Sequence, residues 1–220
     1  MITNKTKLLI FDMDGLLVDS ERVYREGWNY GLRKCHVDIP DSVILSWAGK
    51  SFHDTTAYLR RICKEETLCR RVREERENYI YRSLYDGNLT AKPYALDALR
   101  CAKEYGYQTG LATSSLKDRS KAILDHLGLL SYLDIPVFAD DVKRLKPYPD
   151  LYRTVLHRAC CTAEQALAFE DSKTGYQAAE AAGIPVILIP DQSLSMNDND
   201  IPEDAERDLS IIRKWITKKN

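Results

Sequence analysis

Residues Leu8–Gly15 read LLIFDMDG and are the most informative segment of the chain for its fold class. Its four apolar residues, with no polar alternation, are typical of a short strand buried on both faces of a parallel sheet. The strand runs directly into Asp12 and Asp14, and ligands of open α/β sheets bind beyond the carboxyl ends of strands. Gly15 then allows the backbone to turn sharply. The stretch therefore predicts an α/β sheet with two acids where a ligand would bind.

Further apolar runs of the same kind recur along the chain, and helical patterns separate them. Three of these helical patterns end at a glycine (Gly106, Gly128 and Gly183), which is a common helix stop. The alternation predicts a doubly wound, parallel-sheet, Rossmann-like α/β core. The remaining predicted strands are Gln108–Ala112, Ile135–Ala139, Ala166–Phe169 and Pro185–Ile189.

Residues 19–88 do not follow this alternation. They contain no convincing strand, and Tyr24, Trp28 and Leu32 recur at the spacing of one helical face. Arginines and glutamates interleave later in the segment, a mixture typical of solvated helix faces with short-range ion pairs. We therefore predict an all-helical inserted domain over residues 19–88, with residues 1–18 and 89–220 forming the α/β core.

Composition excludes several classes of protein. The 220 residues are 44% hydrophobic and 30% charged, which argues against wholesale disorder. A net charge of −1 argues against a nucleic-acid binder that works through a basic field. No apolar stretch is long enough for a signal peptide or a membrane span, and none of the six cysteines forms a C-x-x-C pair. We expect a cytoplasmic monomer with free thiols.

The two acids after the first strand are placed to act on one ligand. Residues at i and i+2 of an extended stretch point the same way, so Asp12 and Asp14 can approach a common site. Two carboxylates this close repel one another, which favours one as nucleophile and the other as proton donor. The alternative is a surface Asp-x-Asp-Gly turn with no chemistry.

Three other strand ends also carry polar groups, and each has a simpler structural interpretation. Thr113 and Ser114 could hold a phosphate oxygen or cap the next helix. Lys146, set among turn residues, could bind an anion or lie in solvent. Glu170 and Asp171 offer the hard oxygen ligands that Mg²⁺ prefers, or they could begin a helix.

Taken together and in this order, the four clusters resemble the haloacid dehalogenase-like hydrolase superfamily. The similarity is greatest to its branch of β-phosphoglucomutases and sugar-phosphate phosphatases, and it implies that the helical insert is a mobile cap. Tyr94 departs from the pattern, since relatives usually have glycine after the proline. The motifs that carry the resemblance are Phe11–Glu21, Ala112–Ser115, Lys146–Asp150 and Phe169–Gly175.

The resemblance implies a mechanism and a ligand set. Asp12 would attack phosphorus to give an aspartyl-phosphate, and Asp14 would protonate the leaving alcohol and then activate water. Mg²⁺ would be held by Asp12, the Asp14 backbone carbonyl and Asp171, with Glu170 beside them or joined to the metal through water. The phosphoryl group would be bound by Thr113, Ser114 and Lys146.

Asp14 also discriminates among the reactions of the superfamily. Members that resemble dehalogenases or phosphonatases lack an acid at this position, so the chain resembles the phosphate-cleaving members. We expect a Mg²⁺-dependent phosphatase that hydrolyses a small phosphorylated metabolite, with a sugar phosphate as the expected substrate. A receiver-like signalling domain is a remote alternative, against which the helical insert counts.

A phosphomutase of the β-phosphoglucomutase type is a closer alternative. Those enzymes carry an arginine where this chain has Phe52 and a histidine where it has Tyr24, so both departures weaken the mutase interpretation. The insert nevertheless offers candidate substrate contacts. Gly49–Ser51 resembles a specificity loop, or it forms a helix-capping turn with a solvated lysine, and the aromatic pair Tyr24 and Trp28 could equally belong to the core of the insert. The candidates are Tyr24, Trp28, Gly49, Lys50 and Ser51.

Overall fold

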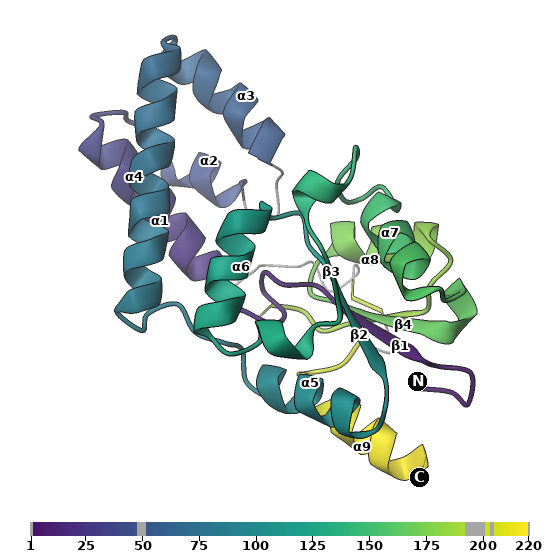
Figure 1. Cartoon of the computed structure of the whole chain (residues 1–220). Coiled ribbons are helices and arrows are strands. Elements are labelled where there is room, and N and C mark those ends of the chain that lie inside the picture. The colour runs from purple at the N-terminus through teal and green to yellow at the C-terminus, as the bar shows by residue number, and fades with distance from the viewer. Residues whose placement is uncertain (1, 48–51, 192–200, 203–204, 220) are drawn as a thin grey trace. The chain divides into compact units, whose positions relative to one another are not determined.

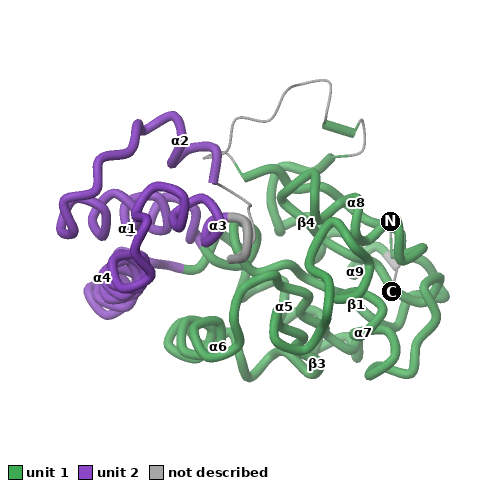
Figure 2. The backbone as a smooth tube through the Cα atoms, turned by 90° about the horizontal axis from the view of Figure 1, so that it is seen from above, with its two compact units in different colours: residues 1–18, 91–220 green, residues 19–90 purple. Residues whose placement is uncertain are grey.

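The computed structural model describes residues 2–47, 52–191, 201–202 and 205–219. The chain divides into two compact units, one of Met1–Val18 with Ala91–Asn220 and one of Asp19–Thr90 (Figure 2). The chain passes from one unit to the other twice, after Val18 and after Thr90. The two passages are adjacent, because Val18 forms an antiparallel bridge with Ala91 and the Asp19 N–H donates to the Thr90 carbonyl at 2.9 Å. The second unit thus ends two residues beyond the range expected from the sequence.

The first unit is built on one five-stranded parallel sheet with the order β3-β2-β1-β4-β5 (Figure 1). β2 and then β3 lie on one side of β1, and β4 and then β5 lie on the other. The carboxyl ends of β1 and β4 therefore lie where the strand order reverses, the position at which doubly wound sheets bind ligands. The strands are β1 (Leu8–Phe11), β2 (Gln108–Ala112), β3 (Ile135–Val137), β4 (Ala166–Glu170) and β5 (Val186–Leu188).

The predicted α/β fold is confirmed, and the strands form where the apolar runs lie. All four residues of β1 are buried, as expected for a central strand covered on both faces. β3 ends two residues before its predicted end, because the Phe138 N–H turns to the Asp141 carboxylate at 2.9 Å and begins the 3-10 turn η2 (Ala139–Asp141).

Helices cover both faces of this sheet. α7 (Asp150–Ala159) and α8 (Lys173–Ala181) share one apolar cluster with Leu8 and Ile10 of β1. Successive side chains of a strand point to opposite faces, so Leu9 and Phe11 face the other layer, where α5 packs on α9 (Figure 1). The other elements of this unit are α5 (Ala95–Glu104), α6 (Lys117–His126), η1 (Leu130–Tyr132), η3 (Ala163–Gln165) and α9 (Ser210–Lys219).

The second unit is helical over its described residues. Its longest helices, α1 and α4, pack against each other and share an apolar cluster with residues of the two shorter helices. Trp28 and Trp47 meet edge to face within that cluster, with ring centroids 4.8 Å apart. The helices are α1 (Glu21–Lys34), α2 (Asp41–Leu45), α3 (Phe52–Cys63) and α4 (Glu66–Tyr85).

No helix in the described part of the chain combines the length and the apolarity needed to cross a membrane.

Candidate active site

Asp12 lies directly beyond the carboxyl end of β1. Its N–H donates to the Phe169 carbonyl of β4 at 3.1 Å, which continues the pairing of the two strands and fixes the Asp12 backbone. The Lys146 ammonium, which comes from the loop before α7, donates to Asp12 Oδ1 and to Glu170 Oε1. A lysine separated from the nucleophile candidate by 134 residues of sequence is thus brought into direct contact with it.

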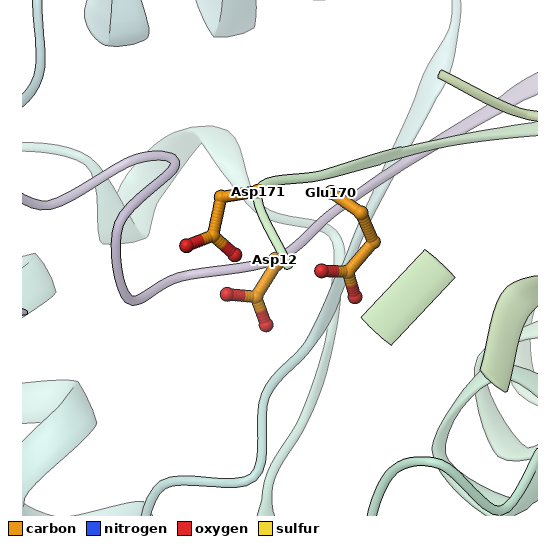
Figure 3. Close-up of side chains that lie close together, drawn as sticks. All are labelled: Asp12, Glu170 and Asp171. Atoms are coloured by element: carbon orange, nitrogen blue, oxygen red, sulfur yellow. The ribbon is translucent and has the colours of Figure 1, made fainter. Parts of the chain in front are cut away.

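Three carboxylates meet at this point of the sheet. Asp12, Glu170 and Asp171 each place one oxygen so that all three lie within 4.8 Å of one another, and all three residues are buried (Figure 3). Glu170 Oε2 is buried and has no hydrogen-bond partner among the described residues. The Lys146 ammonium bonds to two of these carboxylates. A divalent cation with a preference for oxygen ligands fits this donor set.

The ionisation of Asp12 and Lys146 reflects this crowding. Burial raises the pKa of Asp12 to about 8; the Lys146 ammonium opposes this rise, and the carboxylates of Glu170 and Asp14 add to it. Burial acts to lower the pKa of Lys146, but the charges of Asp12 and Glu170 outweigh it and hold that pKa above its usual range. Lys146 therefore stays cationic.

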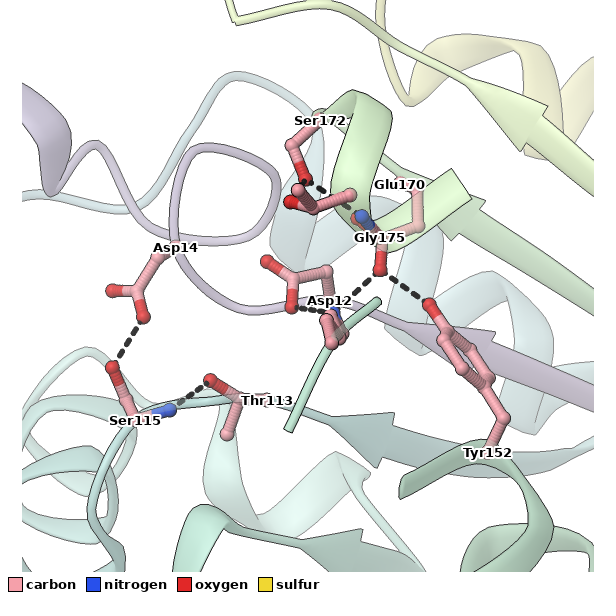
Figure 4. A network of polar contacts seen from close by, with 10 residues as sticks. Asp12, Asp14, Thr113, Ser115, Tyr152, Glu170, Ser172 and Gly175 are labelled. Atoms are coloured by element: carbon pink, nitrogen blue, oxygen red, sulfur yellow. Dashed lines mark hydrogen bonds and ion pairs between the residues drawn. The ribbon is translucent and has the colours of Figure 1, made fainter. Parts of the chain in front are cut away.

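Asp14 is held away from the three carboxylates. Ser115 Oγ donates to Asp14 Oδ2 at 2.6 Å (Figure 4). Arg119 of α6 donates to the same serine oxygen at 3.1 Å. The chain leaves the extended strand after Asp12, so the i, i+2 alternation does not carry the Asp14 side chain into the acidic cluster. Gly15, at φ 81°, makes the turn that follows.

The end of β2 supplies the predicted hydroxyl groups. Thr113 is buried, and its Oγ1 accepts the Ser115 N–H at 3.1 Å, which shapes the turn after the strand. Ser114 Oγ is buried without a hydrogen-bond partner among the described residues. The Ser114 hydroxyl can therefore bind a ligand oxygen, and the Thr113 hydroxyl, which only accepts in this bond, can still donate to one.

Sequence reasoning missed two contributors to the site. Tyr152 of α7 is fully buried and donates its hydroxyl to Glu170 Oε1 (Figure 4). Gly175 of α8 is also required, because a Cβ at this position would stand 1.9 Å from Glu170 Oε2. The family motif includes Gly175 without indicating this contact, and no sequence signal pointed to Tyr152.

Two of the predicted substrate contacts of the second unit lie on α1. The Arg76 guanidinium of α4 stacks on both rings, 5.0 Å from the centroid of Tyr24 and 4.6 Å from that of Trp28. Trp28 is buried within the apolar cluster of this unit. The other three candidates, Gly49, Lys50 and Ser51, lie outside the described residues.

Comparisons with known proteins agree with this geometry. The chain is 33% identical over 183 residues to the validoxylamine A 7'-phosphate phosphatase of Streptomyces hygroscopicus subsp. limoneus, covering 81% of this chain and 83% of that one. It is 32% identical over 187 residues to a phosphorylated carbohydrates phosphatase of Thermotoga maritima, covering 80% and 81% of the two chains.

Solved structures share the fold as well. A β-phosphoglucomutase candidate from Thermotoga maritima superposes with a TM-score of 0.76 at 27% identity, over 97% of this chain and 99% of that one. CbbY from Rhodobacter sphaeroides superposes with a TM-score of 0.80 over 93% and 95% of the two chains. The sequence pattern of one family matches residues 9–189, which include the complete acidic cluster. The chain belongs to the haloacid dehalogenase-like hydrolase family.

Proposed function

We propose that this phosphoric monoester hydrolase is Mg²⁺-dependent and releases phosphate from a small phosphorylated sugar through an aspartyl-phosphate on Asp12. The observation that carries the proposal is the buried group of Asp12, Glu170 and Asp171, with Lys146 bonded to the first two. The substrate class is supported by relatives that are named as phosphatases of phosphorylated carbohydrates and of fructose 1-phosphate.

Asp12 acts as the nucleophile in this proposal. An Asp12 carboxylate oxygen forms a bond to phosphorus while the bond from phosphorus to the sugar oxygen breaks, and the electron pair of that bond leaves with the sugar oxygen. Asp14 gives its proton to that oxygen. Asp14 then takes a proton from a water molecule, which attacks the phosphorus and releases Asp12. The hydrogen bond from Ser115 holds the Asp14 carboxylate during both transfers.

The remaining groups bind and neutralise the phosphoryl group. Mg²⁺ would be held by Asp12, Asp171 and Glu170 together with the Asp14 backbone carbonyl, and it would neutralise the charge between two anions. Lys146 adds a fixed positive charge at Asp12, and the free hydroxyl of Ser114 donates to a phosphoryl oxygen. Thr113 shapes the turn that presents the Ser114 hydroxyl and backbone N–H.

Residues 19–88 would form a cap that selects the sugar. In this proposal Tyr24 contributes aromatic surface, and Trp28, which is buried in the apolar cluster of the unit, supports it. Gly49, Lys50 and Ser51 contribute a specificity loop. We further propose that the enzyme works as a cytoplasmic monomer and binds neither nucleic acid nor membranes.

A panel of phosphorylated sugars with Mg²⁺, read as phosphate release, tests the proposal. We expect turnover of at least one ester that falls by about 1000-fold or more in Asp12→Asn. Asp118→Asn, at an exposed acid of α6, is the matched control and should keep wild-type activity.

Two results would favour the alternatives. Interconversion of sugar phosphates that needs a bisphosphate activator and releases little free phosphate would support the mutase. Stoichiometric phosphorylation without turnover would support a signalling domain. Negligible phosphate release across the whole panel, with folded protein and Mg²⁺ present, would contradict the phosphatase proposal.

A further inference from the structure

A buried ion pair lies beside the acidic cluster and is not explained by the family motifs. Lys92 Nζ donates to Asp191 Oδ1 at 3.1 Å, and the Asp191 side chain is 0% exposed while that of Lys92 is 21% exposed. The two residues are 99 positions apart in the sequence. A buried carboxylate is costly unless a charge compensates it, and the Lys92 ammonium supplies a compensating charge to Asp191 inside the core unit.

The backbone places both members of the pair. The Lys92 N–H donates to the Leu17 carbonyl at 3.0 Å, in the turn that follows Asp12 and Asp14. On the other side, the Ile189 N–H donates to the Glu170 carbonyl at 2.7 Å, which extends the β5 pairing and sets Asp191 two residues further on. The pair is thus anchored to the same two segments that carry the acidic cluster.

Gly15 shows how near Asp191 lies to the cluster. A Cβ at Gly15 would stand 2.1 Å from Asp171 Oδ2 and 3.0 Å from Asp191 Oδ2. Both carboxylates therefore crowd the same face of one glycine. Asp191 is not among the three residues that could ligate the ion together, so its influence would be exerted through its charge and its position beside Asp171.

We propose that Asp191, balanced by Lys92, is a positioning residue that tunes the affinity of the Asp12–Glu170–Asp171 cluster for Mg²⁺. The Asp191 charge raises the negative potential at Asp171 and favours the cation, while the Lys92 charge limits that potential. The inference rests on the proposed function only in the identity of the ion. Asp191 and Lys92 are not ligands of the ion in this proposal. Their charges set the Mg²⁺ concentration at which the cluster is half occupied.

Calorimetric titration of the full-length protein with MgCl₂ at pH 8 tests this directly, without substrate. We expect Asp191→Asn to weaken Mg²⁺ binding by about 10-fold, the effect typical of groups that support metal ligands. Lys92→Met should shift the affinity in the opposite direction, and Lys92→Arg should stay near wild type because the charge is kept. The double variant Lys92→Met/Asp191→Asn, which buries no uncompensated charge, should fall between the two single variants.

Lys103→Gln is the matched control, since Lys103 pairs with Asp134 at the start of β3, the opposite edge of the sheet. It should leave Mg²⁺ affinity unchanged. Equal loss of affinity in Asp191→Asn and Lys92→Met would show a merely structural pair and overturn the proposal, as would unchanged affinity in both. If Asp191→Asn fails to fold, the double variant decides by comparison with Lys92→Met, because an affinity equal to or tighter than that of Lys92→Met overturns the role of Asp191.

These outcomes are distinct from failure of the proposed function. If the wild type binds Mg²⁺ but releases phosphate from no ester, the phosphatase proposal is refuted. The proposal that Asp191 and Lys92 tune the Mg²⁺ affinity is then unaffected. Absence of Mg²⁺ binding by the wild type would overturn both.

Discussion

At the scale of single residues, the site depends on buried charges whose partners come from distant parts of the chain. Glu170 is 0% exposed, and its Oε1 accepts bonds from both Lys146 and Tyr152. Burial, followed by the charge of Glu170, raises the pKa of Tyr152 well above its usual value, so the tyrosine remains a hydrogen-bond donor. Tyr152 thereby fixes one metal-ligand candidate without adding charge.

Tyr152→Phe tests the strength of this support. The substitution removes one donor from a buried carboxylate, and we expect the free energy of unfolding to fall by about 1–3 kcal/mol. Urea denaturation followed by circular dichroism measures the change. Tyr105→Phe, at a tyrosine that is 44% exposed, is the control and should be neutral. Equal stability of Tyr152→Phe and wild type would contradict the role of this bond.

Tyr94 shows backbone strain at a single residue. It precedes α5 in the left-handed region, at φ 65°, and its side chain is half exposed. Left-handed backbone costs about 1–2 kcal/mol for a residue with a Cβ, a cost that glycine avoids. This agrees with the glycine that relatives usually have at the position.

We expect Tyr94→Gly to raise the free energy of unfolding by about 0.5–1 kcal/mol, because relief of strain exceeds the added entropy of the unfolded chain. Tyr94→Ala should not stabilise the protein, since alanine keeps the Cβ. Thermal unfolding of both variants distinguishes strain from loss of the aromatic ring. A gain in the alanine variant equal to that in the glycine variant would refute the strain argument.

At the scale of elements, two glycines set how closely α1 approaches α4. A Cβ at Gly31 would stand 2.5 Å from the Val72 carbonyl oxygen, whereas one at Gly27 would stand 3.3 Å from Arg76 Cγ. The first neighbour is backbone and cannot move without shifting α4. The second is part of a side chain.

The two sites therefore predict different responses to alanine. Gly31→Ala gains about 1 kcal/mol of helix propensity. It should still destabilise the protein by about 1–3 kcal/mol, because the contact forces the helices apart. Gly27→Ala is the matched variant and should be far milder. Denaturant unfolding measures both, and a more stable Gly31→Ala would disprove this account of the packing.

The turn between β3 and α7 carries a pH-sensitive contribution to stability. Burial acts to raise the pKa of Asp141, but hydrogen bonds from the Phe138 N–H and from Arg158 lower it below its ordinary value. The folded state therefore binds the Asp141 proton less readily than the unfolded state. Its stabilising contribution is complete above the unfolded pKa of about 3.9 and is lost as the pH falls through the lower folded pKa.

We expect Asp141→Asn to be less stable than wild type at pH 7, with the difference shrinking as the pH falls below about 4. Urea unfolding at a series of pH values measures the difference. Asp118→Asn should show no such trend, because its side chain is exposed. A difference that grows on acidification would contradict the direction of the pKa shift.

At the scale of the whole molecule, the helical unit is inserted between two chain segments that already pair in the core. Val18 bridges Ala91, and the Lys92 N–H bonds to the Leu17 carbonyl at 3.0 Å. The core unit also has its own apolar cluster between the sheet, α7 and α8. Both features indicate that the core unit can fold without residues 19–90.

We expect a variant with residues 19–90 replaced by a short glycine-serine linker to unfold cooperatively and to bind Mg²⁺ as tightly as wild type, while activity on sugar phosphates is lost. Differential scanning calorimetry and MgCl₂ titration check the first two expectations. Absence of a cooperative transition would show that the core needs the inserted unit in order to fold.

Sequence patterns are sufficient to predict where the strands lie, that a helical insert follows the first strand, and which acids follow the strands. These features are local, since a buried strand must read as an apolar run and a polar group after it falls at a sheet edge. The bond between Asp14 and Ser115, the support of Glu170 by Tyr152 and the pairing of Lys92 with Asp191 become visible only in the folded chain. These contacts join segments far apart in the chain, and they form because burial in a densely packed core requires each charge to find a partner, which local sequence pattern does not specify.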